Sequence, residues 1–459
     1  MSPIMPAPGL EDFAAFVAER TGLYFPPERL TDLERAVARA APELGFADAA
    51  ACIGGLLASP PDKERLETLA AYLTVGETYF FRNKSDFGAI ENIILPAIAA
   101  GMNGDESVRI WSAGCATGEE PYSIAMLLDG GAPALKGRGV SILATDINSS
   151  ALREAGRGVY GEWSFREVPP HIRDKYFAKT TGKKMALLPR IKKKVDFSYL
   201  NLVEDSYPAL LTATNAMDLI LCRNVLMYFR ADLAEAVLRK FQASLKDGGW
   251  LILGPAEGPL NFPGPAPALK PAQIPGVTIF RKTGGAQPAD APVFPAETPA
   301  PVFSITPAMG TTAPVPPAPP PAGPPSAAGL LLLARGRANL GRLAEAEELC
   351  SKAIEAGKLN PLAHYLLGII FMEEGRDGEA AHSFRRALYL APDHIPAHLA
   401  LGNLFLRGGK AAQARGHFKN AAALLKRYKP DETLAEPEGM AAGRLLAIAR
   451  SALARCAHD

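Results

Sequence analysis

The chain has 459 residues and carries 49 Lys and Arg against 48 Asp and Glu, which gives a formal net charge of +1 at pH 7. This length predicts two to four domains, and the near-zero charge gives no overall attraction to nucleic acid. The five cysteines are scattered without a Cys-x-x-Cys pair, which indicates neither a disulfide framework nor a zinc site. No apolar run approaches the ~20 residues of a membrane span and the N-terminus has no signal pattern, so we expect a soluble, cytoplasmic chain.

Residues 10–72 are predicted to form a small helical domain, because apolar residues recur there at the spacing of one helix face. The second helix would carry a basic stripe made of Arg29, Arg35 and Arg39, which acidic residues interrupt. Taken by itself, such a stripe indicates a solvated helix face.

The run from Arg109 to Ser123 predicts a buried strand, a glycine-bearing loop and a helix start in direct succession. Gly114 and Gly118 let the backbone turn and approach a ligand without an intervening Cβ. Glu119 and Glu120 then open an amphipathic helix, where carboxylates suit the positive end of the dipole. These acids would repel a phosphate, so the loop favours a ligand that is cationic or rich in hydroxyls, such as S-adenosylmethionine. A tight turn with two helix-start acids is the plainer alternative.

Between residues 108 and 283, short β-rich runs alternate with helical patterns, which is typical of a parallel sheet covered by helices. An insert at residues 160–195 breaks the alternation with a turn signal at Thr181-Gly182 and a run of basic residues. The expected strands lie at 108–112, 140–145, 195–197, 218–222 and 250–253, followed by a closing hairpin at 268–270 and 277–281.

Asp146 follows the second expected strand, at the edge where ligands bind in sheets of this kind. An acid at this place accepts hydrogen bonds from both hydroxyls of a ribose. Its plain structural role would be to cap the helix that begins near Asn148. The combination with Gly114 and Glu119 favours the ligand role.

Residues 284–326 are predicted to be an extended linker, because roughly a third of the positions are proline and such a composition buries no core. Beyond it, at residues 327–455, small residues recur every 34 positions, which predicts three tetratricopeptide repeats and a capping helix at 441–454. His394 and His398 lack an accompanying cysteine or carboxylate cluster, so we expect no metal site. The recurring residues are Gly341, Gly375 and Gly409, then Ala346, Ala380 and Ala414, and then Ala353, Ala387 and Ala421.

Four motifs together resemble the CheR-type chemotaxis receptor methyltransferases, which esterify glutamate side chains of chemoreceptors. They lie at 78–82, 109–123, 144–147 and 221–229, and the resemblance covers roughly residues 10–283. It implies a class I, Rossmann-like α/β methyltransferase domain at 73–283 with S-adenosylmethionine as cofactor. It also implies an N-terminal helical domain at 10–72 and a small inserted β-subdomain at 160–195.

The resemblance also assigns the site. Arg82 would steer a carboxylate and Tyr228 would orient the attacking oxygen. For the aromatic residues, forming the walls of an apolar pocket is an equal alternative. The family more often has asparagine where this chain has Gly76, so one polar contact is expected to be missing. The residues expected to bind the cofactor are Gly76, Thr78, Arg82, Gly114, Glu119, Asp146, Ile147, Asn201, Leu202, Arg223 and Asn224.

The resemblance implies that the partner is the cytoplasmic domain of a methyl-accepting receptor. The N-terminal helical domain would bind it, and the basic insert is a second candidate contact. The hairpin around Gly182 is shorter than in family members that bind a pentapeptide at the receptor C-terminus, which argues against that tether. The repeats would recruit or regulate an unknown protein, and we expect a monomer without nucleic acid or membrane insertion. Two alternatives stay open, namely an adaptor that binds the cofactor without turnover and a small-molecule O-methyltransferase. Swimming, biofilm formation and development are equally compatible outputs.

Overall fold

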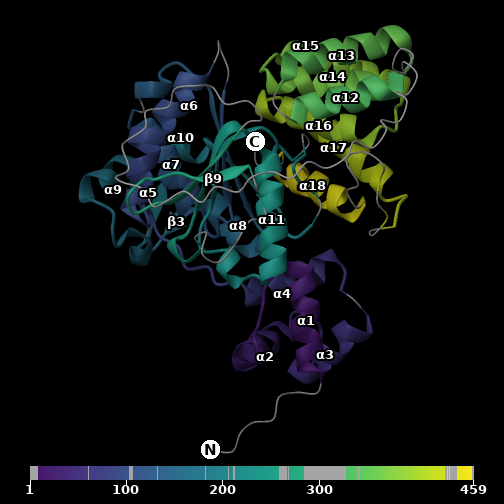
Figure 1. Ribbon diagram of the computed structural model, residues 1–459. Coiled ribbons are helices and arrows are strands. Elements are labelled where there is room, and N and C mark those ends of the chain that lie inside the picture. The colour runs from purple at the N-terminus through teal and green to yellow at the C-terminus, as the bar shows by residue number, and fades with distance from the viewer. Residues whose placement is uncertain are drawn as a thin grey trace, which may run out of the picture.

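The computed structural model describes residues 9–283 and 327–456, apart from gaps at 60, 103–106, 132, 181, 205, 210–211, 258–265, 267, 340–341, 430–431, 433 and 435–441. The predicted linker at 284–326 lies outside the described residues, as do Thr181 and Gly341. Figure 1 shows a small helical bundle, an α/β body and a helical array in chain order. No helix in the described part of the chain is both long enough and apolar enough to cross a membrane.

The N-terminal bundle is helical, as the apolar spacing predicts. Asp48 and Asp62 start two of its helices, because their side chains accept hydrogen bonds from the backbone N–H groups of Ala51 and Arg65. Phe13 and the other apolar residues of the expected faces form one buried cluster. The elements are α1 (Leu10–Thr21), η1 (Pro27–Arg29), α2 (Leu30–Ala40), α3 (Ala49–Ala58) and α4 (Lys63–Leu73).

The α/β body is built on a seven-stranded sheet in the order β6-β2-β1-β7-β8-β10-β9, which confirms the predicted Rossmann-like class. The first five strands pair in parallel, and β10 runs antiparallel to both of its neighbours. β2 lies on one side of β1 and β7 on the other, so the order in which strands are added to the sheet reverses at β1. Ligands bind at the carboxyl ends of the strands beside such a point. The strands are β1 (Val108–Ala113), β2 (Val140–Asp146), β6 (Val195–Tyr199), β7 (Met217–Cys222), β8 (Leu245–Leu253), β9 (Leu269–Pro271) and β10 (Thr278–Lys282).

Helices cover both faces of this sheet, so the central strands are apolar on both sides. In β1, Ile110 packs into one buried cluster and Trp111 into the cluster on the opposite face, where its indole N–H donates to Thr145 Oγ1 at 2.9 Å. The covering elements are α5 (Lys84–Ala89), η2 (Ile90–Ile94), α6 (Leu95–Gly101), α7 (Glu119–Asp129), η3 (Pro133–Leu135), α8 (Ser149–Arg157), η5 (Leu226–Tyr228), α11 (Ala231–Ser244) and η6 (Pro255–Glu257).

The predicted insert is a separate antiparallel sheet in the order β3-β5-β4, which confirms the β-subdomain. Its turn residue Gly182 has a φ of +114°, a conformation that L side chains rarely adopt. The elements of the insert are β3 (Val159–Tyr160), η4 (Glu162–Phe165), α9 (Pro170–Tyr176), β4 (Phe177–Lys179), β5 (Met185–Leu187) and α10 (Pro189–Lys192).

The C-terminal part is an array of paired helices, which confirms the tetratricopeptide repeats. A Cβ at Gly368 would lie 2.6 Å from the ring of Phe384, and one at Gly402 would lie 2.8 Å from the ring of Phe418. These two helix pairs therefore need a glycine opposite the phenylalanine, whereas the first pair has Ala334 at the same repeat position opposite the smaller Cys350. His394 caps a helix through Nδ1, which accepts the N–H of Ala397. The helices are α12 (Ala327–Asn339), α13 (Leu343–Ala356), α14 (Pro361–Glu373), α15 (Asp377–Leu390), α16 (Ile395–Arg407), α17 (Ala411–Leu425) and α18 (Ala442–Arg455).

Candidate functional site

A cavity of about 1030 Å³ opens at the carboxyl ends of β1, β2 and β7. Its walls come from the end of α1, the loop after α4, the glycine loop after β1, and the segments that follow β2, β6 and β7. No residue of the repeats lines it in the described part of the chain. The predicted site residues that it brings together are Gly76, Thr78, Arg82, Gly114, Asp146, Ile147, Asn201, Leu202, Arg223, Asn224 and Tyr228.

The glycine loop packs so closely against neighbouring residues that it has no room for a side chain at two positions. Gly114 has a φ of +79°, and a Cβ there would lie 2.3 Å from a methyl group of Val225. Gly118 has a φ of +92°, and its Cβ would lie 2.9 Å from that of Ala155. Both positions therefore require glycine, and at Gly114 the backbone itself forms the wall of the cavity.

Asp146 has one hydrogen bond to each carboxylate oxygen. Oδ2 accepts the N–H of Ala116 and Oδ1 accepts the N–H of Asn148, both at 2.8 Å. Burial raises the pKa of Asp146, and these N–H groups act in the opposite direction. A carboxylate accepts about four hydrogen bonds, so Asp146 keeps acceptor capacity for a hydroxyl of a ligand.

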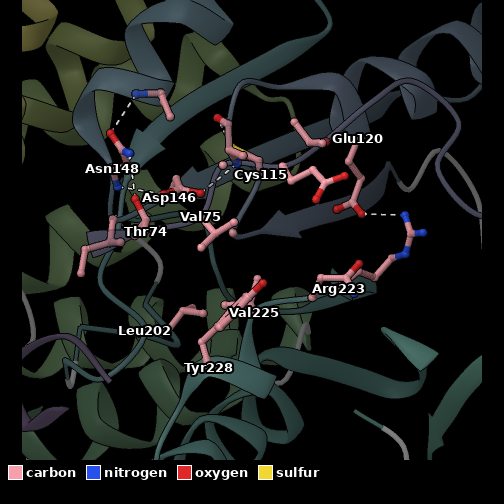
Figure 2. A pocket seen from close by; sticks show the side chains of 18 of the residues that line it. Thr74, Val75, Cys115, Glu120, Asp146, Asn148, Leu202, Arg223, Val225 and Tyr228 are labelled. Atoms are coloured by element: carbon pink, nitrogen blue, oxygen red, sulfur yellow. Dashed lines mark hydrogen bonds and ion pairs between the residues drawn. The ribbon is translucent and has the colours of Figure 1, made fainter. Parts of the chain in front are cut away.

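Asn148 caps the helix that follows β2, a role that the sequence also allowed for Asp146. Asn148 Oδ1 accepts the N–H groups of Ser150 and Ala151, each at 3.0 Å. Its Nδ2 donates to Thr74 Oγ1 at 2.9 Å, so the loop after α4 is joined to the wall that holds Asp146 (Figure 2). The cap is satisfied without the carboxylate, which supports the ligand role of Asp146.

Arg82 lies in a loop that other groups hold in an unfavourable conformation. Its neighbours Phe81 and Asn83 have φ values of +57° and +62°, which cost energy for residues other than glycine. Phe81 N–H donates to Ser123 Oγ at 3.0 Å, and the carbonyl of Arg82 accepts Nη2 of Arg223 at 2.6 Å. The Arg82 guanidinium donates to the carbonyl of Glu77 at 2.7 Å, and no carboxylate of the described residues pairs with it.

Arg223 is buried and its charge is used within the protein. Its Nε lies 2.8 Å from Asp86 Oδ2, and its Nη1 lies 2.9 Å from Glu120 Oε2, a contact visible in Figure 2. Burial raises the pKa of Asp86, and the adjacent guanidinium opposes this shift. Arg223 lines the cavity as predicted, but its contacts favour positioning of the Arg82 loop over direct contact with a ligand.

Glu257 is a residue that sequence reasoning missed. It is fully buried, and its carboxylate accepts four backbone N–H groups at 2.6 to 3.1 Å. Asn224, one of these donors, has a φ of +59°, so Glu257 stabilises a turn that is otherwise unfavourable. A Cβ at Gly254 would lie 2.7 Å from Oε2 of Glu257. The carboxylate therefore fits here only because residue 254 is glycine. The other donors are Gly254, Val225 and Met227.

Glu119 is the predicted site residue that does not line the cavity. Its Oε2 accepts Thr117 Oγ1 at 2.7 Å, and its Oε1 accepts Ser164 Oγ at 2.9 Å. Burial raises the pKa of its carboxyl group. Contact with a ligand stays a prediction for Glu119, whereas its neighbour Glu120 does line the cavity.

The N-terminal bundle closes one side of the cavity. Leu23 pairs with Phe229 in an isolated bridge, and the carbonyl of Tyr228 accepts the N–H of Tyr24 at 2.7 Å. Asn201 Nδ2 donates to the carbonyl of Arg20 at 2.8 Å, which joins the segment after β6 to α1. The bundle and the sheet therefore form the cavity together.

Two parts of the chain are similar to known protein families. A family model described as CheR methyltransferase, SAM binding domain, matches residues 76–263, and a tetratricopeptide repeat model matches residues 361–394. The chain is 30% identical over 345 residues to the probable biofilm formation methyltransferase WspC of Pseudomonas aeruginosa, covering 72% of this chain and 79% of that protein. It is 36% identical over 201 residues to chemotaxis protein methyltransferase 1 of the same organism, covering 43% and 71%. It is 37% identical over 191 residues to the chemotaxis protein methyltransferase of Borreliella burgdorferi, covering 40% and 65%.

Proposed function

The chain belongs to the CheR family of S-adenosylmethionine-dependent methyltransferases, and we propose that it esterifies glutamate side chains on the cytoplasmic domain of a methyl-accepting, chemotaxis-type receptor. The observation that supports this most is the pairing of two features in one cavity. Asp146 offers carboxylate oxygens to ribose hydroxyls, and Arg82 offers a guanidinium without a carboxylate partner among the described residues.

The chemistry asks little of the protein beyond alignment. A glutamate with a pKa near ~4.3 is already the nucleophilic anion at neutral pH. When bound, S-adenosylmethionine supplies the methyl group, and the electron pair of the broken carbon–sulfur bond stays on sulfur, so no acid or base is required. Holding the carboxylate in line contributes up to ~7–11 kcal/mol in the best intramolecular models. We assign this positioning to Arg82 and to the hydroxyl of Tyr228.

The residues of the cavity fit the cofactor. The glycine wall at Gly114 admits a ligand close to the backbone, and Asp146 suits the ribose. Asn201 and Leu202 are proposed to hold the adenine, and Asn224 to face the reacting end. A Cβ at Gly76 would have no neighbouring atom within 4 Å. The space that the family's asparagine side chain would fill is therefore open in this chain.

The receptor contact is proposed to involve the N-terminal bundle and the basic insert. In α2, Asp32 pairs with Arg29 at 3.3 Å and with Arg35 at 3.7 Å. Such exposed pairs contribute little, so a receptor carboxylate can replace Asp32. We further propose that the repeats bind a separate protein partner, that the enzyme is a cytoplasmic monomer, and that no pentapeptide tether is used.

The output of the pathway is proposed to be biofilm formation rather than swimming. The match to the biofilm formation methyltransferase extends over 345 residues, whereas the matches to two chemotaxis methyltransferases extend over 201 and 191. The longer match exceeds the 211 residues of a domain at 73–283, so it reaches into other parts of the chain.

The direct test is to incubate the protein with methyl-labelled S-adenosylmethionine and membranes of the source cell. We expect one labelled band of receptor size, and a weaker band with an Asp146→Ala variant at a cofactor concentration near the wild-type Kd. Label in a small extractable molecule would favour a small-molecule methyltransferase. Binding of the cofactor without any labelled product would favour the adaptor.

Asp146→Ala should weaken binding of S-adenosylhomocysteine by about 1–3 kcal/mol, or roughly 5- to 150-fold in Kd, because hydroxyls of the ligand lose their acceptor. Calorimetry measures the change directly. Asp247→Ala, which removes an acid that is 62% exposed in β8, is the matched control and should bind normally. Unchanged affinity in a folded Asp146→Ala protein would refute the ribose assignment.

Residues 1–283 should bind S-adenosylhomocysteine with the affinity of the full chain. The residues that line the cavity lie between Thr21 and Phe229, and the repeats bury a separate apolar core of their own. Calorimetry on the fragment and on the full chain should agree within about threefold. A tenfold weaker fragment would mean that the repeats complete the site.

A further inference from the structure

One exposed apolar side chain lines the cavity, and a second lies next to a residue that lines it. Val75 lines the cavity and is 58% exposed, and Figure 2 shows it between Asp146 on one side and Tyr228 on the other. Met227 is 48% exposed, and its sulfur lies 3.9 Å from Nδ2 of the cavity residue Asn224. Exposed apolar side chains that lie together beside a ligand cavity indicate a surface that binds a partner.

A third exposed apolar residue, Trp163, is fixed beside the same cavity through Arg166. The Arg166 guanidinium lies 4.1 Å from the ring centre of Trp163 and 3.5 Å from that of Tyr79. It also pairs with Glu77 at 3.2 Å. Tyr79 and Glu77 both line the cavity, and Trp163 itself is 65% exposed. Stacking on two aromatic faces orders the guanidinium and holds the indole at the rim.

The substrate must cross this rim. In the proposed reaction the methyl acceptor is a side-chain carboxylate, which is short, so the backbone that carries it has to lie across the mouth while the carboxylate reaches Arg82. Residues on either side of the acceptor then contact whatever the rim presents. Inside the cavity, the group complementary to the acceptor carboxylate is the cation of Arg82. At the rim, the surface that contacts the neighbouring residues of the substrate is apolar.

We propose that Val75, Trp163 and Met227 form a docking rim for apolar side chains that flank the acceptor glutamate, and that this rim selects which glutamates are methylated. The inference rests on the proposed function, since it takes the acceptor to be a glutamate in a protein. The partner is thus a receptor segment in which an acidic residue has apolar neighbours, rather than a uniformly acidic stretch.

The test compares full-length wild-type protein with Trp163→Ala and Met227→Ala on an isolated receptor fragment. We expect KM to rise about tenfold in each variant, the usual effect of removing an anchoring side chain, with kcat and the Kd for S-adenosylhomocysteine unchanged. Trp163→Phe should restore most of the loss. Ile93→Ala removes an apolar residue of similar exposure, 44%, that does not line the cavity, and should behave as wild type.

A substrate pair gives a second readout. A synthetic segment whose acceptor glutamate has leucine neighbours should be methylated by the wild type with a KM roughly tenfold lower than the same segment with serine neighbours. Trp163→Ala should abolish that preference. Unchanged KM values would refute the proposed docking rim. A loss of cofactor affinity in the variants, in place of a higher KM, would also refute it. If the wild type binds S-adenosylhomocysteine but methylates no protein at all, the proposed function fails, and the rim loses its partner with it.

Discussion

Arg82→Ala should lower kcat for receptor methylation by roughly 10²-fold, because the acceptor carboxylate loses the group that holds it in line with the methyl group. Among the described residues, the Arg82 side chain donates to the carbonyl of Glu77 alone and pairs with no carboxylate. Its loss leaves no buried partner without a hydrogen bond, so the free energy of unfolding should change little. Initial rates, a thermal melt and calorimetry with S-adenosylhomocysteine together measure these quantities.

Arg82→Lys is the informative companion variant. It keeps the charge but loses the planar fork that grips a carboxylate at two points, so it should fall between wild type and alanine. If the cofactor's own carboxylate is the one held, the Kd for S-adenosylhomocysteine will rise together with the fall in rate. An Arg82→Ala protein that methylates the receptor at the normal rate would show that the residue is only structural.

Glu257→Ala should lower the free energy of unfolding by at least about 3 kcal/mol. The change leaves four buried or partly buried N–H groups without an acceptor, and each unsatisfied group costs about 1–3 kcal/mol. It also releases Asn224 from its left-handed conformation. Urea unfolding, followed by circular dichroism, measures the loss from the shift in midpoint.

Glu257→Gln keeps the size of the side chain but has one acceptor oxygen in place of two, so we expect a smaller loss of stability. Glu162→Ala removes an exposed acid from η4 and should leave the midpoint within about 0.5 kcal/mol of wild type. An unchanged midpoint in Glu257→Ala would contradict the role given to this carboxylate.

The parallel sheet and the repeats were predictable because each follows from a pattern in the sequence, whereas the β-structure of the insert was expected only from the family resemblance. Strands buried on both faces give short apolar runs such as 108–112, and the repeats place small residues every 34 positions where helices must pack closely. The glycine loop was predictable too, since Gly114 and Gly118 stand directly between a strand and a helix.

The charge network behind the site was not predictable from local patterns. Arg223 reaches Glu120 across 103 residues and the carbonyl of Arg82 across 141, and only the folded sheet brings these groups together. Glu257 follows β8 as an isolated acid, and nothing in its neighbourhood indicates that four backbone donors converge on it. The sequence also left two roles for Asp146, and the cap made by Asn148 now supports one of them.

The central claim is methyl transfer to a side-chain carboxylate, and the stability of the new bond tests it most directly. Receptor labelled by this protein with methyl-labelled S-adenosylmethionine should be treated with mild alkali, and the volatile fraction collected. An ester predicts that nearly all label leaves as methanol, and that an Arg82→Ala reaction yields almost none. Label that stays on the protein through alkali would indicate methylation of nitrogen and would contradict the account.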